Sequence, residues 1–350
     1  MGDRAVSADV LSVPRATLTT FEDDLALEDG GVLPRARLVI ATYGTLAADA
    51  SNAILFPTRF GATHEANEWL IGPGLAFDPE RWFIVVPNLF GNGASSSPSN
   101  TPAPYDRGCF RRVTIRDNVG FQHKAIAALF GIERFALAAG WSMGAQQAYQ
   151  WAVSYPDAVA RLAVICGAAR TAPHNAVFLK SLEAALLADP EFEGGDYVEP
   201  PKAGLRAMGR IYAGWAYSQA WYRTGCHLEM GYADLDAYLA GYWDTLFEAR
   251  DANDLLAHIT TWLSHDVGTT PDCDGLEDAL GRITAPTLLM PGRHDLYFCP
   301  EDNAAELPHL GNGRLKEIDS IWGHMCGSGQ SAEDTALISA RLARFLAASE

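Results

Sequence analysis

The chain has 350 residues, 48% of them hydrophobic, which is enough for one large core or for a core with an insertion. The formal net charge of −17 and the lack of a basic patch argue against nucleic acid and anionic membrane surfaces as partners. No apolar run could span a bilayer, and residues 1–7 lack the apolar core of a secretory signal. The six cysteines form no C-x-x-C pair, so we expect reduced thiols in a cytoplasmic protein.

Apolar runs and helical patterns alternate through the first half of the chain. Fully apolar runs such as residues 82–87 are typical of parallel strands buried on both faces of a sheet. Because strands that alternate with helices form βαβ units, we expect a mostly parallel sheet with helices on both faces. The predicted strands are residues 16–21, 37–46, 53–56, 82–87, 135–139 and 162–166, and the predicted helix before the fifth strand is residues 115–130.

The pattern changes in the segment 171–281, which is largely helical and rich in aromatic residues. We interpret it as a helical cap inserted over the carboxyl edge of the sheet, with its aromatic stripes serving as core or dimer contacts. The α/β pattern then resumes with strands predicted at 286–291 and 314–319 and an amphipathic helix at 333–347. The predicted domains are therefore a core of residues 1–170 and 282–350 and a cap of residues 171–281.

The strongest chemical signal lies in residues 136–146. A short buried strand runs into Gly140–Gly144, with the sequence Gly-Trp-Ser-Met-Gly, and a helical pattern follows at once. A G-x-S-x-G motif between a strand and a helix is the signature of a nucleophile elbow, whose tight turn leaves no room for a Cβ at the glycines. A glycine-rich turn with an incidental serine is the alternative, but the flanking strand and helix favour Ser142 as a nucleophile.

A serine nucleophile needs a base that takes its proton and an acid that orients the base. With this kind of elbow, the acid follows the serine in the chain and the histidine comes last. Asp295 stands just after a late strand, and His324 stands in the loop after the last strand. They are the predicted acid and base. Asp302 is an alternative acid, but it lies further into the next helical pattern.

Four other histidines are weaker candidates for the base. His294 precedes the predicted acid, so we interpret it as a packed or solvated neighbour. His309 follows a proline and is typical of a surface loop. His258 and His265 lie in the predicted cap, where a structural role is expected.

Two backbone amides are expected to stabilise the oxyanion of the reaction. The first is the N–H of Met143, at the start of the helix after the serine. The second should come from the loop after the strand 53–56, where the N–H of Arg59 or of Phe60 is the candidate. The sequence does not decide between these two residues.

No cofactor or metal is expected from the sequence. The run Gly91–Ala94 lacks the G-K-[ST] ending of a phosphate-binding loop and is interpreted as a turn. No histidines and cysteines have the spacing of metal ligands. We interpret Cys326, two residues after His324, as a small apolar loop residue.

With these motifs the chain resembles the homoserine O-acetyltransferase family of α/β-hydrolases. The resemblance implies the α/β-hydrolase fold, a helical cap, a deep acyl pocket and a homodimer, and it places the family's triad on Ser142, Asp295 and His324. The strings that carry the resemblance are Thr42–Leu46 with Asn52-Ala53, Ile71–Gly74, Gly140–Tyr149, Tyr155–Asp157, Ala188–Pro190 with Gly194–Tyr197, and Asp251–Asp254.

The chain departs from the acetyltransferase pattern where the substrate should bind. In those transferases the catalytic histidine is followed by an aspartate that holds the amine of homoserine, but Met325 follows His324 here. The cap arginine of the family falls on Gly209, with Arg210 one place further on. A site without these charges should reject a zwitterion, because its charges would be desolvated without partners. We expect Trp141, Met325 and Arg210 to lie in the substrate pocket.

These departures favour the subgroup of the family that hydrolyses short-chain esters such as acetates. The first hypothesis is therefore a serine esterase that acts on a small acetyl ester. The second is an acyltransferase that moves acetyl from acetyl-CoA to homoserine or another hydroxyl acceptor, since the triad chemistry is the same. The third is a non-catalytic binding protein, which the presence of all three triad candidates disfavours.

Overall fold

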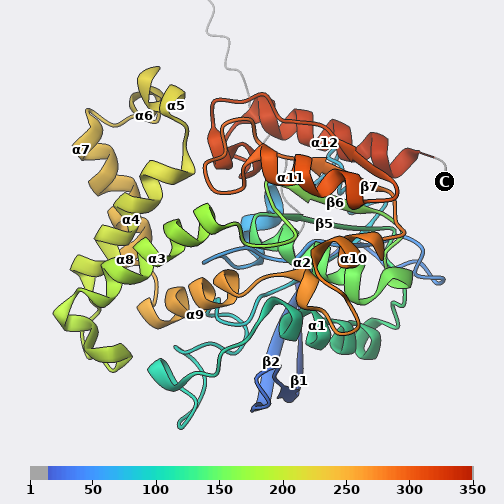
Figure 1. Cartoon of the computed structure of the whole chain (residues 1–350), viewed down its shortest axis with the longest axis horizontal. Coiled ribbons are helices and arrows are strands. Elements are labelled where there is room, and N and C mark those ends of the chain that lie inside the picture. The colour runs from blue at the N-terminus through green and yellow to red at the C-terminus, as the bar shows by residue number, and fades with distance from the viewer. Residues whose placement is uncertain (1–14, 349–350) are drawn as a thin grey trace, which may run out of the picture.

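A computed structural model describes residues 15–348, so the N-terminal segment 1–7 considered above lies outside the described residues. Its centre is one eight-stranded sheet with the order β1-β2-β4-β3-β5-β6-β7-β8 (Figure 1). The pairs β1–β2 and β2–β4 are antiparallel, and every pairing from β4 onward is parallel. The strands are β1 Thr17–Ala26, β2 Val32–Tyr43, β3 Ala53–Leu55, β4 Phe83–Pro87, β5 Leu137–Trp141, β6 Leu162–Ile165, β7 Thr287–Met290 and β8 Gly313–Leu315.

Helices cover both sides of this sheet, with α12 and α1 on opposite sides in Figure 1. This arrangement confirms the predicted α/β-hydrolase architecture. The local signals for α1 are a capping box between Thr114 and Asp117 and a left-handed Gly131 after its last residue. The helices are α1 Ile115–Phe130, α2 Met143–Ser154, α3 Pro173–Leu187, α4 Lys202–Ala216, α5 Gln219–Arg223, α6 Cys226–Glu229, α7 Leu235–Tyr238, α8 Thr245–Glu248, α9 Ala252–Leu263, α10 Leu276–Gly281, α11 Pro300–Glu306 and α12 Ala332–Ala347.

Helices α3 to α8 gather beside the sheet, at the left of Figure 1, and a π-helical turn at Leu239–Asp244 joins α7 to α8. The next helix, α9, returns to the sheet. Its residues His258 and Thr261 bond to loops that follow the strands, through Gly61, Phe90 and Val113. The segment 171–281 contains helices and no strand, but its division from the core as a separate cap stays a proposal.

Several strand boundaries differ from the sequence-based ones. β1 continues to Ala26, beyond the predicted end at residue 21, and β5 spans Leu137–Trp141 instead of residues 135–139. β2 begins at Val32, because its first residues pair with the end of β1 across the turn at Gly30. β8 ends at Leu315, since only three of its residues pair with β7, and the chain beyond touches the sheet again through an isolated bridge at Ile318. Within residues 15–348, no helix combines the length and the apolar character needed to cross a bilayer.

Candidate active site

The turn between β5 and α2 has the geometry of a nucleophile elbow. Ser142 lies between these elements with φ 59° and ψ −129°, a conformation that a non-glycine residue adopts only under constraint. Both glycines of the motif are sterically required. A Cβ at Gly140 would overlap the backbone of Gly144, and a Cβ at Gly144 would lie 2.6 Å from the carbonyl oxygen of Pro57. The strained turn is therefore held by close backbone contacts on both sides of the serine.

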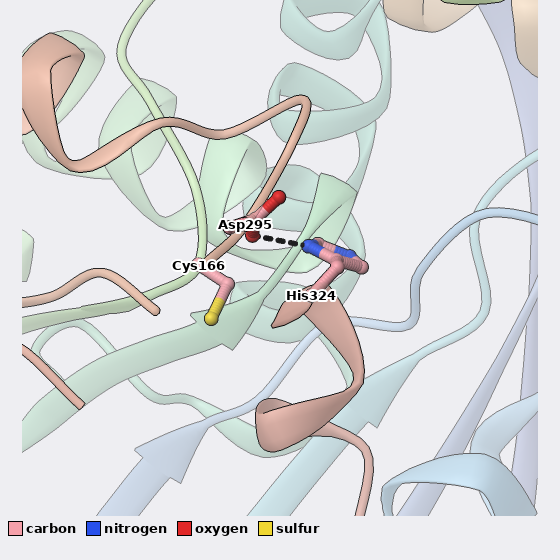
Figure 2. A group of neighbouring side chains, drawn as sticks. All are labelled: Cys166, Asp295 and His324. Carbon is pink, nitrogen blue, oxygen red and sulfur yellow. Dashed lines mark hydrogen bonds and ion pairs between the residues drawn. The ribbon is translucent and has the colours of Figure 1, made fainter. Parts of the chain in front are cut away.

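The predicted acid and base lie together at the carboxyl ends of the strands (Figure 2). Asp295 follows β7, and its Oδ2 accepts a hydrogen bond of 2.6 Å from Nδ1 of His324. Its Oδ1 accepts from the backbone N–H groups of Tyr297 and Phe298, at 3.1 and 3.0 Å. The histidine ring also stacks on Trp141, with centroids 5.1 Å apart. These contacts fix the ring and leave Nε2 as its free nitrogen.

Ser142 and His324 line the same cavity of about 110 Å³, together with the predicted pocket residues Trp141 and Met325. The serine, the histidine and Asp295 are all buried, with 2%, 1% and 3% of their surface exposed. The cavity is thus small, and it brings the predicted nucleophile and base together. The other residues that line it are Arg59, Phe60, Tyr212, Tyr242, Trp243, Leu246, Phe247, Arg250 and Gln330.

The loop that should supply the second oxyanion donor is held in place by two buried polar side chains. Nδ1 of His258 accepts the N–H of Gly61 at 2.9 Å, and Nε2 of Gln147 donates to the carbonyl of Thr58 at 2.8 Å. The N–H groups of Arg59 and Phe60 donate to no acceptor among residues 15–348. Both amides therefore remain candidates beside Met143, whose N–H belongs to the unpaired first turn of α2.

The rejected alternatives lie away from the cavity. Asp302 lies in α11 and lines a different surface hollow. His294 is exposed, and His309 lies at the surface near Glu277. His265 is buried, and this burial lowers its pKa to about 3. These positions agree with the roles that the sequence suggested.

The pocket prediction for Arg210 is not supported by the geometry. Its guanidinium forms two hydrogen bonds with Asp244, at 3.1 and 2.8 Å, and the residue does not line the cavity. The arginine side chains at the cavity are instead Arg59 and Arg250. Sequence reasoning missed both: Arg59 was considered only for its backbone amide, and no pattern marks Arg250, which directly precedes the family string Asp251–Asp254.

Cys166 lies beside the acid and base, and its Sγ comes within 4.8 Å of ligand atoms of Asp295 and His324 (Figure 2). Such a trio has the composition of a metal site. The short Asp295–His324 hydrogen bond already uses the facing atoms, however, and the thiol is 3.5 Å from Sγ of Cys326. Hydrogen bonding with Cys326, and then burial, raises the pKa of the Cys166 thiol. A neutral thiol is a poor metal ligand, so we interpret Cys166 as packing beneath the acid and base.

Comparison with known proteins agrees with this geometry. Residues 53–326 match the family model described as alpha/beta hydrolase fold. The chain is 39% identical to an ethyl acetate hydrolase of Pseudomonas veronii, over 92% of this chain and 93% of that protein. It is 33% identical to a homoserine O-acetyltransferase of Leifsonia xyli subsp. xyli, over 92% of this chain and 87% of that protein.

A solved structure gives the same result. The acetylester hydrolase of Corynebacterium glutamicum superposes with a TM-score of 0.92 at 36% identity, over 95% of this chain and 96% of that one. The resemblance to the homoserine O-acetyltransferase family, on its esterase side, is confirmed. The predicted class, carboxylic ester hydrolase, is confirmed at the level of these relatives.

Proposed function

The chain belongs to the α/β-hydrolase fold family, and from this premise we propose that it is a serine esterase that hydrolyses short-chain esters, acetyl esters foremost. The observation that carries the proposal is the cavity that Ser142 and His324 share, with Asp295 bound to the far side of the histidine at 2.6 Å. Two relatives support the acetyl group by name, since one is an ethyl acetate hydrolase and another an acetylester hydrolase.

The first step forms an acyl-enzyme. Oγ of Ser142 attacks the ester carbonyl carbon while Nε2 of His324 takes its proton, and Asp295 stabilises the resulting imidazolium. The N–H of Met143 and an N–H of the loop 57–61 donate to the oxyanion. When the carbon–oxygen bond to the alcohol breaks, His324 returns the proton to the departing alkoxide.

The second step releases the acid. Water enters the position that the alcohol has left, gives a proton to His324, and attacks the acyl-serine carbonyl. Collapse of the tetrahedral intermediate frees the carboxylic acid and restores the proton to Ser142. The cavity of about 110 Å³ suits a short acyl chain such as acetyl.

Acetyl transfer to homoserine is the second candidate, because a homoserine O-acetyltransferase is among the relatives. The cavity lining argues against it. No aspartate or glutamate is among the described residues that line the cavity, so an ammonium group would lose its hydration without a counter-charge. Met325 stands next to His324 at this wall. The segment 171–281 as a cap, the homodimer and the cytoplasmic location belong to the same proposal, on the strength of the family resemblance.

The test uses the purified protein with ethyl acetate, measuring acetate release, and with acetyl-CoA plus homoserine, measuring free CoA. We expect ester hydrolysis, no homoserine-dependent release of CoA, and loss of hydrolysis in Ser142→Ala. Ser181→Ala is the control, because that serine is partly exposed on α3, bonds only its own helix and does not line the cavity. Wild-type activity in Ser142→Ala would refute the mechanism. Efficient formation of O-acetylhomoserine would instead establish the transferase.

A further inference from the structure

Two arginine side chains face the proposed nucleophile without an acidic partner. Arg59 and Arg250 both line the cavity of Ser142. Among residues 15–348, no carboxylate oxygen lies within ion-pair distance of either guanidinium. Two arginines on the neighbouring helix α4 differ in this respect, since Arg206 pairs with Glu248 and Arg210 with Asp244. The cavity arginines therefore lack the acidic partner that both arginines of α4 have.

The two guanidinium groups use little of their hydrogen-bonding capacity. Arg59 donates from Nη1 to the carbonyl of Phe60, and its Nε is buried without an acceptor. Arg250 donates from Nε to the carbonyl of Leu246. A guanidinium carries five N–H donors, so most of them stay available to a ligand in the cavity.

These charges are costly where they stand. Burial lowers the pKa of Arg250 to about 10, with the nearby charge of Arg59 as the next cause, and burial also lowers the pKa of Arg59. Both side chains stay protonated near neutral pH, so two like charges face one cavity. A bound anion would relieve both their mutual repulsion and their lost hydration.

A purely structural role explains only part of this arrangement. The guanidinium of Arg59 lies 4.6 Å from the ring centre of Trp141, a cation–π contact that supports the elbow. That of Arg250 lies against Gly61, where a Cβ would displace it. A neutral side chain of similar length could fill both places without the charge repulsion. The two positive charges in the cavity of Ser142 are therefore better explained by a bound ligand.

We infer that this cavity recognises an ester that carries a carboxylate group, held by Arg59 and Arg250. The inference rests on the proposed esterase function and narrows its substrate class. The carboxylate forms charge-assisted hydrogen bonds with the two guanidinium groups while Ser142 attacks the ester carbonyl. Because no acidic side chain among residues 15–348 lines the cavity, the substrate is an acidic ester without an ammonium group, which excludes amino acids.

The experiment compares charged and neutral esters of similar size. Acetoxyacetate, with the charge on the alcohol side, is paired with 2-methoxyethyl acetate. Monoethyl succinate, with the charge on the acyl side, is paired with ethyl pentanoate. We expect wild-type kcat/KM, normalised to the rate of alkaline hydrolysis, to favour at least one charged ester tenfold or more over its neutral partner. Preference for acetoxyacetate would place the bound carboxylate on the alcohol side of the ester, and preference for monoethyl succinate would place it on the acyl side.

Arg250→Met should lower this charged-to-neutral ratio by about 10- to 100-fold, the worth of a charge-assisted hydrogen bond. Arg250→Lys should keep part of it. Arg206→Met is the control, because its guanidinium pairs with Glu248 outside the cavity, and its ratio should equal that of the wild type. As a measurement on the wild type alone, methoxyacetate should inhibit hydrolysis of the neutral ester competitively, and methoxyacetamide should not.

Hydrolysis of the neutral esters with no preference for either charged ester and no inhibition by methoxyacetate would overturn the anion site and leave the esterase proposal standing. An equal ratio in Arg250→Met and wild type would likewise overturn it. Absence of hydrolysis of all four esters would refute the proposed function itself.

Discussion

Replacing His258 by glutamine tests how a buried neutral histidine holds the proposed oxyanion loop. Nδ1 of His258 accepts the N–H of Gly61 at 2.9 Å, which leaves Nε2 to donate to the carbonyl of Phe90 at 3.1 Å. The ring has no exposed surface, and burial lowers its pKa to about 3. Protonation would place a proton on Nδ1, against the N–H of Gly61. The folded protein therefore excludes the charged form, and the unfolded chain does not.

The sign of the effect follows from the bound protons. Between about pH 6.5 and pH 3 the unfolded chain holds a proton on this histidine and the folded protein does not, so folding stability falls as the pH falls. Integrating the two titrations gives a loss of about 2 kcal/mol in the free energy of unfolding between about pH 7.5 and about pH 5. This stability is fully present above the unfolded pKa of the histidine.

The wild-type pH profile alone does not isolate this contribution. Burial raises the pKa of Glu306 to about 7 and that of Asp254 to about 6. These carboxyl groups therefore bind protons at a higher pH in the folded protein than in the unfolded chain, and their contribution to folding stability rises as the pH falls. The difference between wild type and His258→Gln cancels them. Glutamine offers a donor and an acceptor but does not titrate, so we expect the stability of the variant relative to wild type to rise by about 2 kcal/mol between about pH 7.5 and about pH 5.

Urea denaturation followed by tryptophan fluorescence at several pH values measures this difference. Ser181→Ala is the control, because this serine side chain does not titrate and bonds only its own helix, so the stability of the variant relative to wild type should stay constant over the same range. A constant difference between wild type and His258→Gln would refute the reasoning, since it would mean that the folded protein accommodates the charged ring.

Two further predictions concern the elbow and the acid. Gly144→Ala places a Cβ 2.6 Å from the carbonyl oxygen of Pro57. We therefore expect denaturation to show about 1–3 kcal/mol of lost stability, and ester hydrolysis to show a kcat at least tenfold lower. Gly214→Ala is the control, because the space at its Cβ is open, and it should keep full activity. In Asp295→Asn the two backbone N–H groups bound to Oδ1 hold the amide oxygen, so the amide NH2 faces Nδ1 of His324 and forces the proton onto Nε2. A histidine with that tautomer cannot accept the proton of Ser142, so kcat of Asp295→Asn should fall by about 10⁴. Asp302→Asn is the control and should not lower kcat. An active Asp295→Asn would show that His324 has another orienting partner.

The candidate triad could be located from the sequence because each member follows a feature of the local chain. Ser142 stands in a motif whose glycines are required by backbone contacts, and those contacts lie within a few residues or against the adjacent loop. Asp295 and His324 each follow a predictable strand, and parallel strands bring their carboxyl ends to one edge of the sheet. The apolar pattern of the sequence predicts the buried strands, and the order of these strands then predicts where the candidate triad residues lie.

The cavity wall could not be predicted in the same way. Arg250 contacts Gly61 although the two residues are far apart in the sequence, and no periodicity describes such a separation. Several other lining residues come from the irregular stretch from α5 to α8. Arg210 shows the limit most clearly. On α4 its guanidinium pairs with Asp244, and a Cβ at the neighbouring Gly209 would meet the backbone of Trp243, so neither position lines the cavity.

The same uncertainty affected Arg59, whose backbone was predicted and whose side chain was not. Its guanidinium lies on the ring of Trp141, which stacks in turn on His324 at 5.1 Å between centroids. In the proposed mechanism His324 gains a positive charge during attack by Ser142. A neighbouring cation opposes that charge in a small cavity between buried groups, and Arg250 adds to the opposition.

An anion bound between the arginines would cancel this opposition when the proton moves to His324. The carboxylate of the inferred substrate would therefore raise kcat as well as lower KM, because part of its interaction strengthens only as the imidazolium forms. Neutral esters would react with the uncompensated site. The inferred specificity then has two sources. The charged ester fits the arginines better, and without a bound anion the arginines disfavour the protonated form of His324.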